Sequence, residues 1–143
     1  MKFNVQALQK QMKKHIEKII GDRVTFKYEI VDDVLDLRAS INLQNHSDDI
    51  FMKIRIGDGV VYTYLTFDKA DATPEMYNLI NEYNDNQLYF RAYITEKGYL
   101  VLDHLYGLVS PDSIEDIVDD FIMKVGKLSD DESLQRITNL THE

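Results

Sequence analysis

Five acidic side chains recur at helical spacing in the segment 110–125, and they are the first residues whose types could do chemistry. Carboxylates spaced i, i+3, i+4, i+7 and i+8 lie on one face of a helix, and their oxygens are ligands for Ca²⁺ and Mg²⁺. Those ions usually require a folded loop or phosphate oxygens as well, and the chain has no EF-hand loop. We therefore expect a solvated face, with a protein-docking surface as the alternative, at Asp112, Glu115, Asp116, Asp119 and Asp120.

Tyrosines at alternating positions form the second candidate surface. Alternate residues of a strand lie on the same side of a sheet, so these rings are expected to crowd one face. Most such rings belong to a core or its rim, whereas an exposed cluster would mark a protein interface. A closed pocket lined by tyrosines and few polar groups would instead indicate a small-molecule-binding regulatory domain. The tyrosines concerned are Tyr62, Tyr64, Tyr89 and Tyr93.

The histidines offer little support for catalysis. His104 follows Asp103 on an expected strand, so the two side chains point to opposite faces and cannot pair directly. His104 shares its face with apolar residues and Tyr106, which favours a partly buried, hydrogen-bonded histidine over a catalytic one. His15 lies at the edge of the apolar stripe of the first helix and is interpreted as a boundary residue.

Motifs for nucleotides, nucleophiles and thiol chemistry are absent from the sequence. There is no GxGxxG, GxxxxGK[ST] or GxSxG motif, and there is no cysteine to form a disulfide or to ligate a metal. The pair Gly57 and Gly59 flanks an Asp and is typical of a hairpin turn. We therefore expect a protein that is not an enzyme, with no catalytic, cofactor-binding or metal-binding residues.

The charge distribution limits the classes of partner. A net charge of −9 argues against a general nucleic-acid binder, which requires a basic face. Residues 1–20 hold five Lys against one Glu, whereas residues 110–143 hold nine acids against three bases. The basic first helix lacks Trp and precedes a strongly acidic region, so we expect it to pack on a sheet rather than on a membrane. Together with the absence of cysteine and of an apolar run of about 18 residues, this predicts a cytoplasmic location.

The apolar pattern predicts the elements that must position these residues. A period of 3.6 indicates helices at 3–20, at 74–83 after Thr73, and at 111–125 after Ser110. A short terminal helix, with capping-box spacing at Ser129 and Glu132, carries the stripe Leu134, Ile137 and Leu140. Alternation indicates strands at 24–30, 35–43, 50–56, 60–67, 88–95 and 99–108, joined by turns that include Asp32 and Asp33. Because short turns join neighbouring strands antiparallel, we expect one α+β domain at 1–143 with helices on an antiparallel sheet, and 128–143 as a short C-terminal helix or tail.

From about Ile50 to Val125 the chain resembles the YbjN family of small bacterial proteins. The resemblance is carried by LINEYNDN at the end of a helix, by LYFRAYITEKGYLVLDHL in the following strands, and by SPDSIEDIVDDFIMKV in the next helix. It implies a twisted antiparallel sheet with helices against it, in a fold like that of type III secretion chaperones. Such chaperones are small, acidic and non-catalytic, are often homodimers, and hold extended segments of a partner protein. Family members are also described as sensory-transduction regulators, and residues 1–45 and 129–143 match nothing in the pattern.

These observations together predict a non-catalytic protein-binding module, chaperone-like or adaptor-like, with a protein client or regulatory partner. A homodimer is expected from the resemblance, from the opposite charges of the two ends, and from more amphipathic surface than one small sheet covers. The stripe on the terminal helix, in particular, has no obvious partner within the chain. A stable dimer buries at least about 1,000 Å² in total.

Overall fold

The computed structural model describes residues 4–43, 49–86 and 89–141, and in them an α+β fold with one antiparallel sheet. The helices are α1 (Val5–Ile20), α2 (Pro74–Asn86), α3 (Ser113–Lys127) and α4 (Glu132–Leu140), with a 3₁₀ turn, η1 (Leu128–Asp130), before the last. The strands are β1 (Lys27–Val31), β2 (Val34–Asn42), β3 (Asp49–Gly57), β4 (Val60–Lys69), β5 (Arg91–Ile94) and β6 (Tyr99–Gly107). The expected α+β class, with helices packed on one antiparallel sheet, is therefore confirmed.

The sheet is ordered β1-β2-β3-β4-β6-β5, and every neighbouring pair is antiparallel. Asp32 and Asp33 both have positive φ, at 52° and 62°, and Asp58 and Gly59 follow the same pattern at 54° and 75°. Two consecutive residues with positive φ make the type I′ turn, whose twist matches that of the strands it joins. These turns set the register of β1 with β2 and of β3 with β4, and both were predicted from the sequence.

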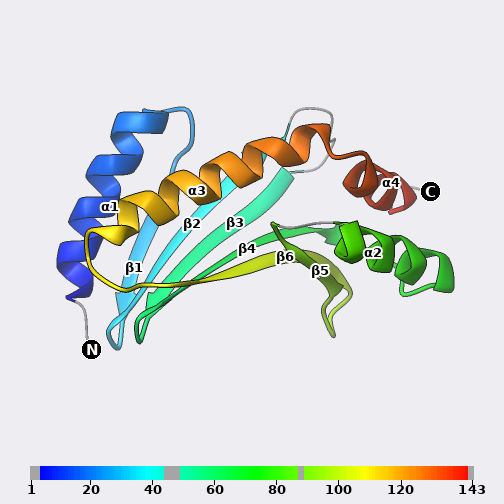
Figure 1. Ribbon diagram of the computed structural model, residues 1–143, viewed down its shortest axis with the longest axis horizontal. Coiled ribbons are helices and arrows are strands. Elements are labelled where there is room, and N and C mark those ends of the chain that lie inside the picture. Colours follow the sequence, from blue (N-terminus) through cyan, green and yellow to red (C-terminus); the bar gives the residue numbers. More distant parts are fainter. Residues whose placement is uncertain (1–3, 44–48, 87–88, 142–143) are drawn as a thin grey trace.

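The helices cover one face of the sheet and leave the other open. In Figure 1, α1 and α3 lie across the first strands, while α2 and α4 lie together at the far end of the molecule. The apolar side chains beneath the helices form one continuous core, in which Leu37, Ile54 and Leu102 are almost completely buried. The alternate side chains of the same strands point to the opposite face, which none of the described helices covers.

Several element ends differ from the prediction. β1 begins at Lys27 rather than at residue 24, because the chain from α1 reaches the sheet edge only there. β5 begins at Arg91, and the first residue of its predicted range lies outside the described residues. Ser110 does not cap α3: the backbone N–H of Ser113 donates to the Ser110 carbonyl at 3.1 Å in a turn that precedes the helix. Thr73 does cap α2, since its Oγ1 accepts from the Met76 N–H at 3.1 Å.

The terminal helix contradicts two expectations. Its cap is Asp131, whose side chain accepts from the Leu134 N–H at 3.0 Å, and not Ser129. Its apolar stripe is buried within the chain, with Leu134 and Ile137 fully inaccessible, because α4 packs against α2. One argument for a homodimer, that this stripe lacks a partner, is therefore wrong.

Candidate functional site

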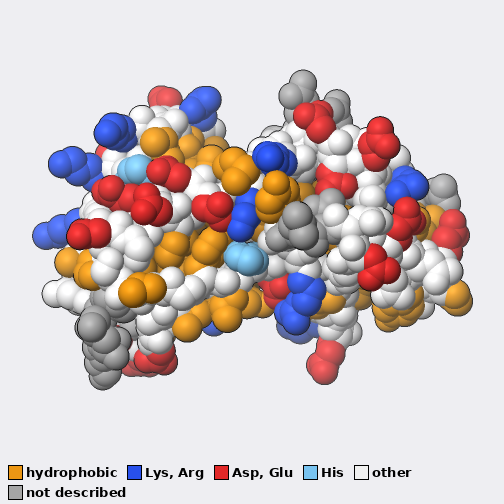
Figure 2. Space-filling model, viewed as in Figure 1, with side chains coloured by type: hydrophobic (Ala, Val, Ile, Leu, Met, Phe, Trp, Pro, Cys, Tyr) orange, Lys and Arg blue, Asp and Glu red, His pale blue; other side chains and the backbone are white. Residues whose placement is uncertain are grey.

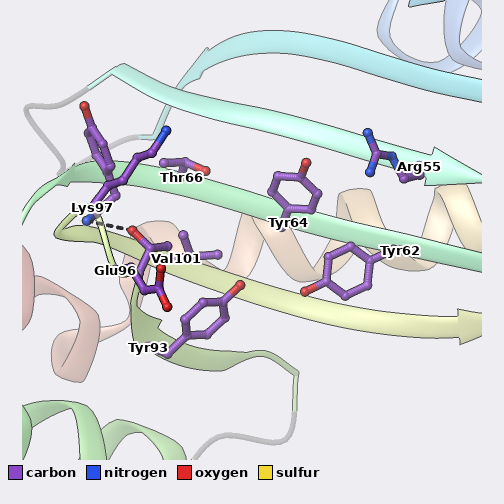
Figure 3. Close-up of a pocket in the computed structure, with 10 residues that line it drawn as sticks. Arg55, Tyr62, Tyr64, Thr66, Tyr93, Glu96, Lys97 and Val101 are labelled. Carbon is purple, nitrogen blue, oxygen red and sulfur yellow. Dashed lines mark hydrogen bonds between the residues drawn. The ribbon is translucent and has the colours of Figure 1, made fainter.

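The open face of the sheet contains a depression with a volume of about 540 Å³. Strands β3, β4, β5 and β6 and the β5–β6 turn supply its side chains, which point away from the translucent α3 helix behind the sheet (Figure 3). Strand alternation accounts for the arrangement, because alternate residues of one strand share a face and adjacent strands bring them side by side. The lining residues are Arg55, Tyr62, Tyr64, Thr66, Tyr93, Thr95, Glu96, Lys97, Tyr99 and Val101.

A buried carboxylate on β6 organises one side of the depression. The side chain of Asp103 is only 5% exposed. It accepts two hydrogen bonds from Arg91, from Nε at 3.1 Å and from Nη2 at 2.7 Å, and a third from the Tyr62 hydroxyl. Three donors on one carboxylate offset the cost of burying its charge. Burial, together with the hydrogen bond to Asp103, raises the pKa of Tyr62, so this phenol stays a neutral donor at ordinary pH.

A second carboxylate, on β2, organises the opposite side. Asp36 accepts hydrogen bonds from Arg55, at 2.8 Å from Nε and 3.1 Å from Nη2. Lys53 and Arg38 bring their charged groups to within 3.7 and 3.8 Å of the same carboxylate. The hydrogen bonds from Arg55 and the charges of the three cations lower the pKa of Asp36, although partial burial acts the other way. Asp36 is therefore ionised and holds the Arg55 guanidinium at the edge of the depression.

Cations lie over the tyrosine rings of this face. The Arg91 guanidinium carbon is 5.0 Å from the ring centre of Tyr93, and Lys53 Nζ is 5.7 Å from that of Tyr64. Tyr62 and Tyr64, two residues apart on β4, have ring centres 5.4 Å apart and tilted by 53°. Cation–π and tilted aromatic contacts stabilise such rings in fixed orientations. The face is thus a preformed surface of aromatic rings and paired charges.

Tyr89 lies elsewhere, which corrects the expectation that the four tyrosines crowd one face. It is on the helix-covered side, where its hydroxyl accepts from Lys127 Nζ at 3.2 Å and its ring lies 5.8 Å from Lys124 Nζ. The alternation argument fails for Tyr89 because this residue precedes β5 and does not belong to a strand. Tyr62, Tyr64 and Tyr93 share the open face as predicted, and Tyr99 joins them.

The acidic residues of α3 project from the helix-covered side, and two of them hold the helix in place. In Figure 2, acidic side chains gather over the first half of α3 beside basic ones over α1. Asp112, Glu115 and Asp116 are exposed, as a solvated face requires. Asp119 accepts a hydrogen bond from His15 Nε2 at 2.7 Å, an ion pair when His15 is protonated, and joins α3 to α1. The first and third helices are thus joined within one chain at this contact.

Asp120 joins α3 to the sheet. It accepts a hydrogen bond from the Tyr106 hydroxyl at 2.7 Å and pairs with Lys124 Nζ at 2.7 Å. Burial and this hydrogen bond raise the pKa of Tyr106. His104 is partly buried beside it, with ring centres 4.5 Å apart in an edge-to-face contact. Burial, and then the charge of Lys124, lower the pKa of His104 and favour its neutral form. As expected, His104 and Asp103 point to opposite faces.

No cluster of three or more His, Asp or Glu side chains in the described ranges is placed to hold a metal ion. None of the helices described is both long enough and apolar enough to span a membrane. Neither the protein-family models, nor the curated proteins, nor the solved structures with which the chain was compared gave a match.

The two carboxylates that organise the open face were not predicted from the sequence. Asp36 and Asp103 lie within β2 and β6, on the face opposite the core, and both are among the buried polar residues of the described chain. An acid within a strand whose neighbours carry Arg or Lys is a detectable signal. Its meaning depends on register, which places Arg55 opposite Asp36 and Arg91 opposite Asp103.

Proposed function

We propose that this chain is a non-catalytic protein-binding module and that the open sheet face holds an extended segment of a partner protein. The observation that carries the proposal is the tyrosine-lined depression on a face that none of the described helices covers. Exposed aromatic clusters are characteristic of protein interfaces, because tyrosine provides a large contact area at a low cost in conformational entropy. The family resemblance favours the same reading, chaperone-like or adaptor-like.

The chemistry of the face favours binding over catalysis. The carboxylates of Asp36 and Asp103 are each held by an arginine, and the raised pKa of Tyr62 keeps its phenol protonated. Groups fixed in this way have little capacity to exchange protons with a substrate. They do hold the rings and guanidinium groups in position before a partner arrives, which reduces the entropy lost on binding.

The charge of the face indicates the partner's composition. The protein as a whole carries a net charge of −9, whereas cations slightly outnumber acids on the strand residues that point to the open face. An acidic partner segment would therefore be repelled less here than over the helices, and the half-exposed Arg55 and the exposed Arg91 offer donors to its carboxylates. Apolar side chains of the segment would pack between the rings. The cations of this face are Lys27, Arg38, Lys53, Arg55, Lys69 and Arg91, and its acids are Glu29, Asp36, Asp49, Asp68 and Asp103.

Affinity capture from the native host tests the proposal. The double variant Tyr64→Ser/Tyr93→Ser removes two rings and leaves in place Arg91 and Tyr62, the donors to Asp103. Tyr77→Ser is the matched control, because Tyr77 is 47% exposed on α2, away from the face. The wild type and the control should retain the same partner and the double variant should lose it. A partner retained by a folded double variant would refute the proposal.

A second candidate is a small-molecule-binding regulatory domain. The volume of about 540 Å³ supports it, since ligand pockets occupy about 300–1,000 Å³. A ligand pocket also encloses most of its ligand, whereas this depression is open along the strands (Figure 3). Native mass spectrometry of protein purified gently from the host separates the candidates: a bound small molecule, lost in the double variant, would favour the regulatory domain.

A further inference from the structure

We propose that a second copy of this chain docks along β1, forming a symmetric dimer in which the two sheets are continuous. The inference concerns the sheet edge and does not depend on what the open face binds. It rests on three observations. The backbone of one sheet edge is hydrogen-bonded to a side chain and that of the other is not, alternate backbone groups of β1 point outward, and the charges of β1 can pair with those of a second copy.

The two edges of the sheet differ in how their backbone groups are satisfied. At the β5 edge, the Asn84 side chain of α2 donates to the Ala92 carbonyl at 3.0 Å and accepts from the Ala92 N–H at 2.8 Å. That amide occupies the place a further strand would take, so α2 closes the edge. At the β1 edge, no strand or side chain within the described residues makes a corresponding contact. An open edge is a template for pairing with another chain.

The turn at Asp32 and Asp33 determines which β1 groups point outward. In a two-residue hairpin the flanking residues form a hydrogen-bonded pair, here Val31 with Val34, and such pairs alternate along the ladder. Glu29 and Lys27 therefore direct their N–H and C=O groups toward β2. Tyr28 and Ile30 direct theirs away from the sheet, available to a second strand.

The charges of β1 select one register for a second copy. When Tyr28 lies opposite Tyr28 of the second copy, each Lys27 lies opposite the other copy's Glu29 on the open-face side. Glu29 also accepts a hydrogen bond from Arg38 Nη2 of its own chain at 3.3 Å and is 56% exposed, so each Glu29 would be shared between two cations. Tyr28 is also an outward-directed residue, so this arrangement makes a hydrogen-bonded pair at the twofold axis. A register centred on Glu29 would bring two like charges together, which is destabilising. Charges on an edge normally discourage pairing, but here their opposite signs and spacing favour a single partner, the chain itself.

Apolar side chains next to the β1 edge would become more buried in the dimer. Phe26 and Ile30 are partly buried against the core, and Val31 remains 55% exposed at the end of the strand. In the Tyr28-centred register, Phe26 faces the second copy's Ile30 on the helix-covered side. The pairing would therefore bury apolar area on that side and ion pairs on the other, and the two open faces would form one surface.

Charge reversal tests the register by sedimentation equilibrium. Lys27→Glu and Glu29→Lys each place like charges across the interface twice, and each should weaken dimerisation at least about tenfold. The double variant Lys27→Glu/Glu29→Lys restores opposite charges and should restore the dimer. Asp85→Lys, the same change in charge as Glu29→Lys at an exposed position of α2, is the control and should have no effect. A monomeric wild type, or a double variant as weak as the single ones, would overturn the proposal.

Backbone measurements test the same interface independently of charge. Exchange of the Tyr28 and Ile30 amides should slow as protein concentration rises, whereas the Glu29 amide should be protected at every concentration. Ile30→Pro removes an N–H that the β1–β2 ladder does not use, so it should give a folded monomer. Amides of Tyr28 and Ile30 that exchange equally fast at all concentrations, or a dimer that survives in folded Ile30→Pro, would show that the chain does not pair through β1.

Discussion

The contact between Tyr62 and Asp103 allows a quantitative test of how the open face is held together. Replacement of Asp103 by Asn preserves the shape of the side chain and removes its charge. Arg91 is 68% exposed, so water takes over much of its solvation and the lost ion pair contributes at most about 1 kcal/mol. The hydrogen bond from Tyr62 changes from one with a charged acceptor to one with a neutral acceptor, a loss of about 1 kcal/mol. The free energy of unfolding should therefore fall by about 2 kcal/mol, which corresponds to about 4–8 °C in melting temperature for a chain of this size.

Denaturant unfolding of a double-mutant cycle isolates the pair. Tyr62→Phe removes only the hydroxyl, and in combination with Asp103→Asn the effects should be non-additive by about 0.5–1 kcal/mol, because the two residues share one hydrogen bond. The pair Tyr77→Phe and Asp103→Asn is the control and should be additive, since Tyr77 lies on α2 and is largely exposed. Additive effects for Tyr62 and Asp103 would refute the view that a hydrogen-bonded network organises this side of the depression.

Three further perturbations test other parts of the structure. Folding raises the pKa of Tyr62, Tyr83 and Tyr106, so their full contribution to the free energy of unfolding should be present below the ordinary tyrosine pKa of about 10 and fall as pH rises above it. Ultraviolet titration should show these phenols ionising together with unfolding. Folding lowers the pKa of Asp36, so its contribution should be present above pH of about 4 and be lost as pH falls through the lowered value; thermal melts should show a smaller acid-side loss in Arg55→Ala. Asn84→Ala should cost about 1–2 kcal/mol and speed exchange of the Ala92 amide in hydrogen-exchange experiments, because both backbone groups lose their partner.

Local patterns were sufficient to predict the elements and the class of the fold. Period-two alternation located β2 and β3, and the pairs Asp32-Asp33 and Asp58-Gly59 located their hairpins, because both signals arise within a few residues of chain. The ends of elements were less well predicted. Ser110 and Ser129 have the right side chains for caps, but nearby Asp112 and Asp131 occupy the N-cap positions, and only contact with the rest of the fold decides between them.

The site required long-range register, which no local pattern contains. The tyrosine positions on β4 followed from alternation, yet the residues that fix them, Asp103 and Lys53, come from β6 and β3, and the Asp36 cluster joins β2 to β3. The misplaced Tyr89 and the buried stripe of α4 have the same origin. The position of Tyr89 depends on its contact with Lys127 of α3, and the burial of the α4 stripe depends on the packing of α4 against α2.

Site-specific photocrosslinking from the open face tests the central claim most directly. A photoreactive phenylalanine analogue at position 64 would project into the depression, and the same group at position 77 serves as the control on α2. In the native host, position 64 should crosslink to one partner protein, through a contiguous segment of that protein, and position 77 should not. Crosslinking that is equal at both positions, or absent at position 64 while the partner is still captured, would contradict the assignment of the open face as the binding surface.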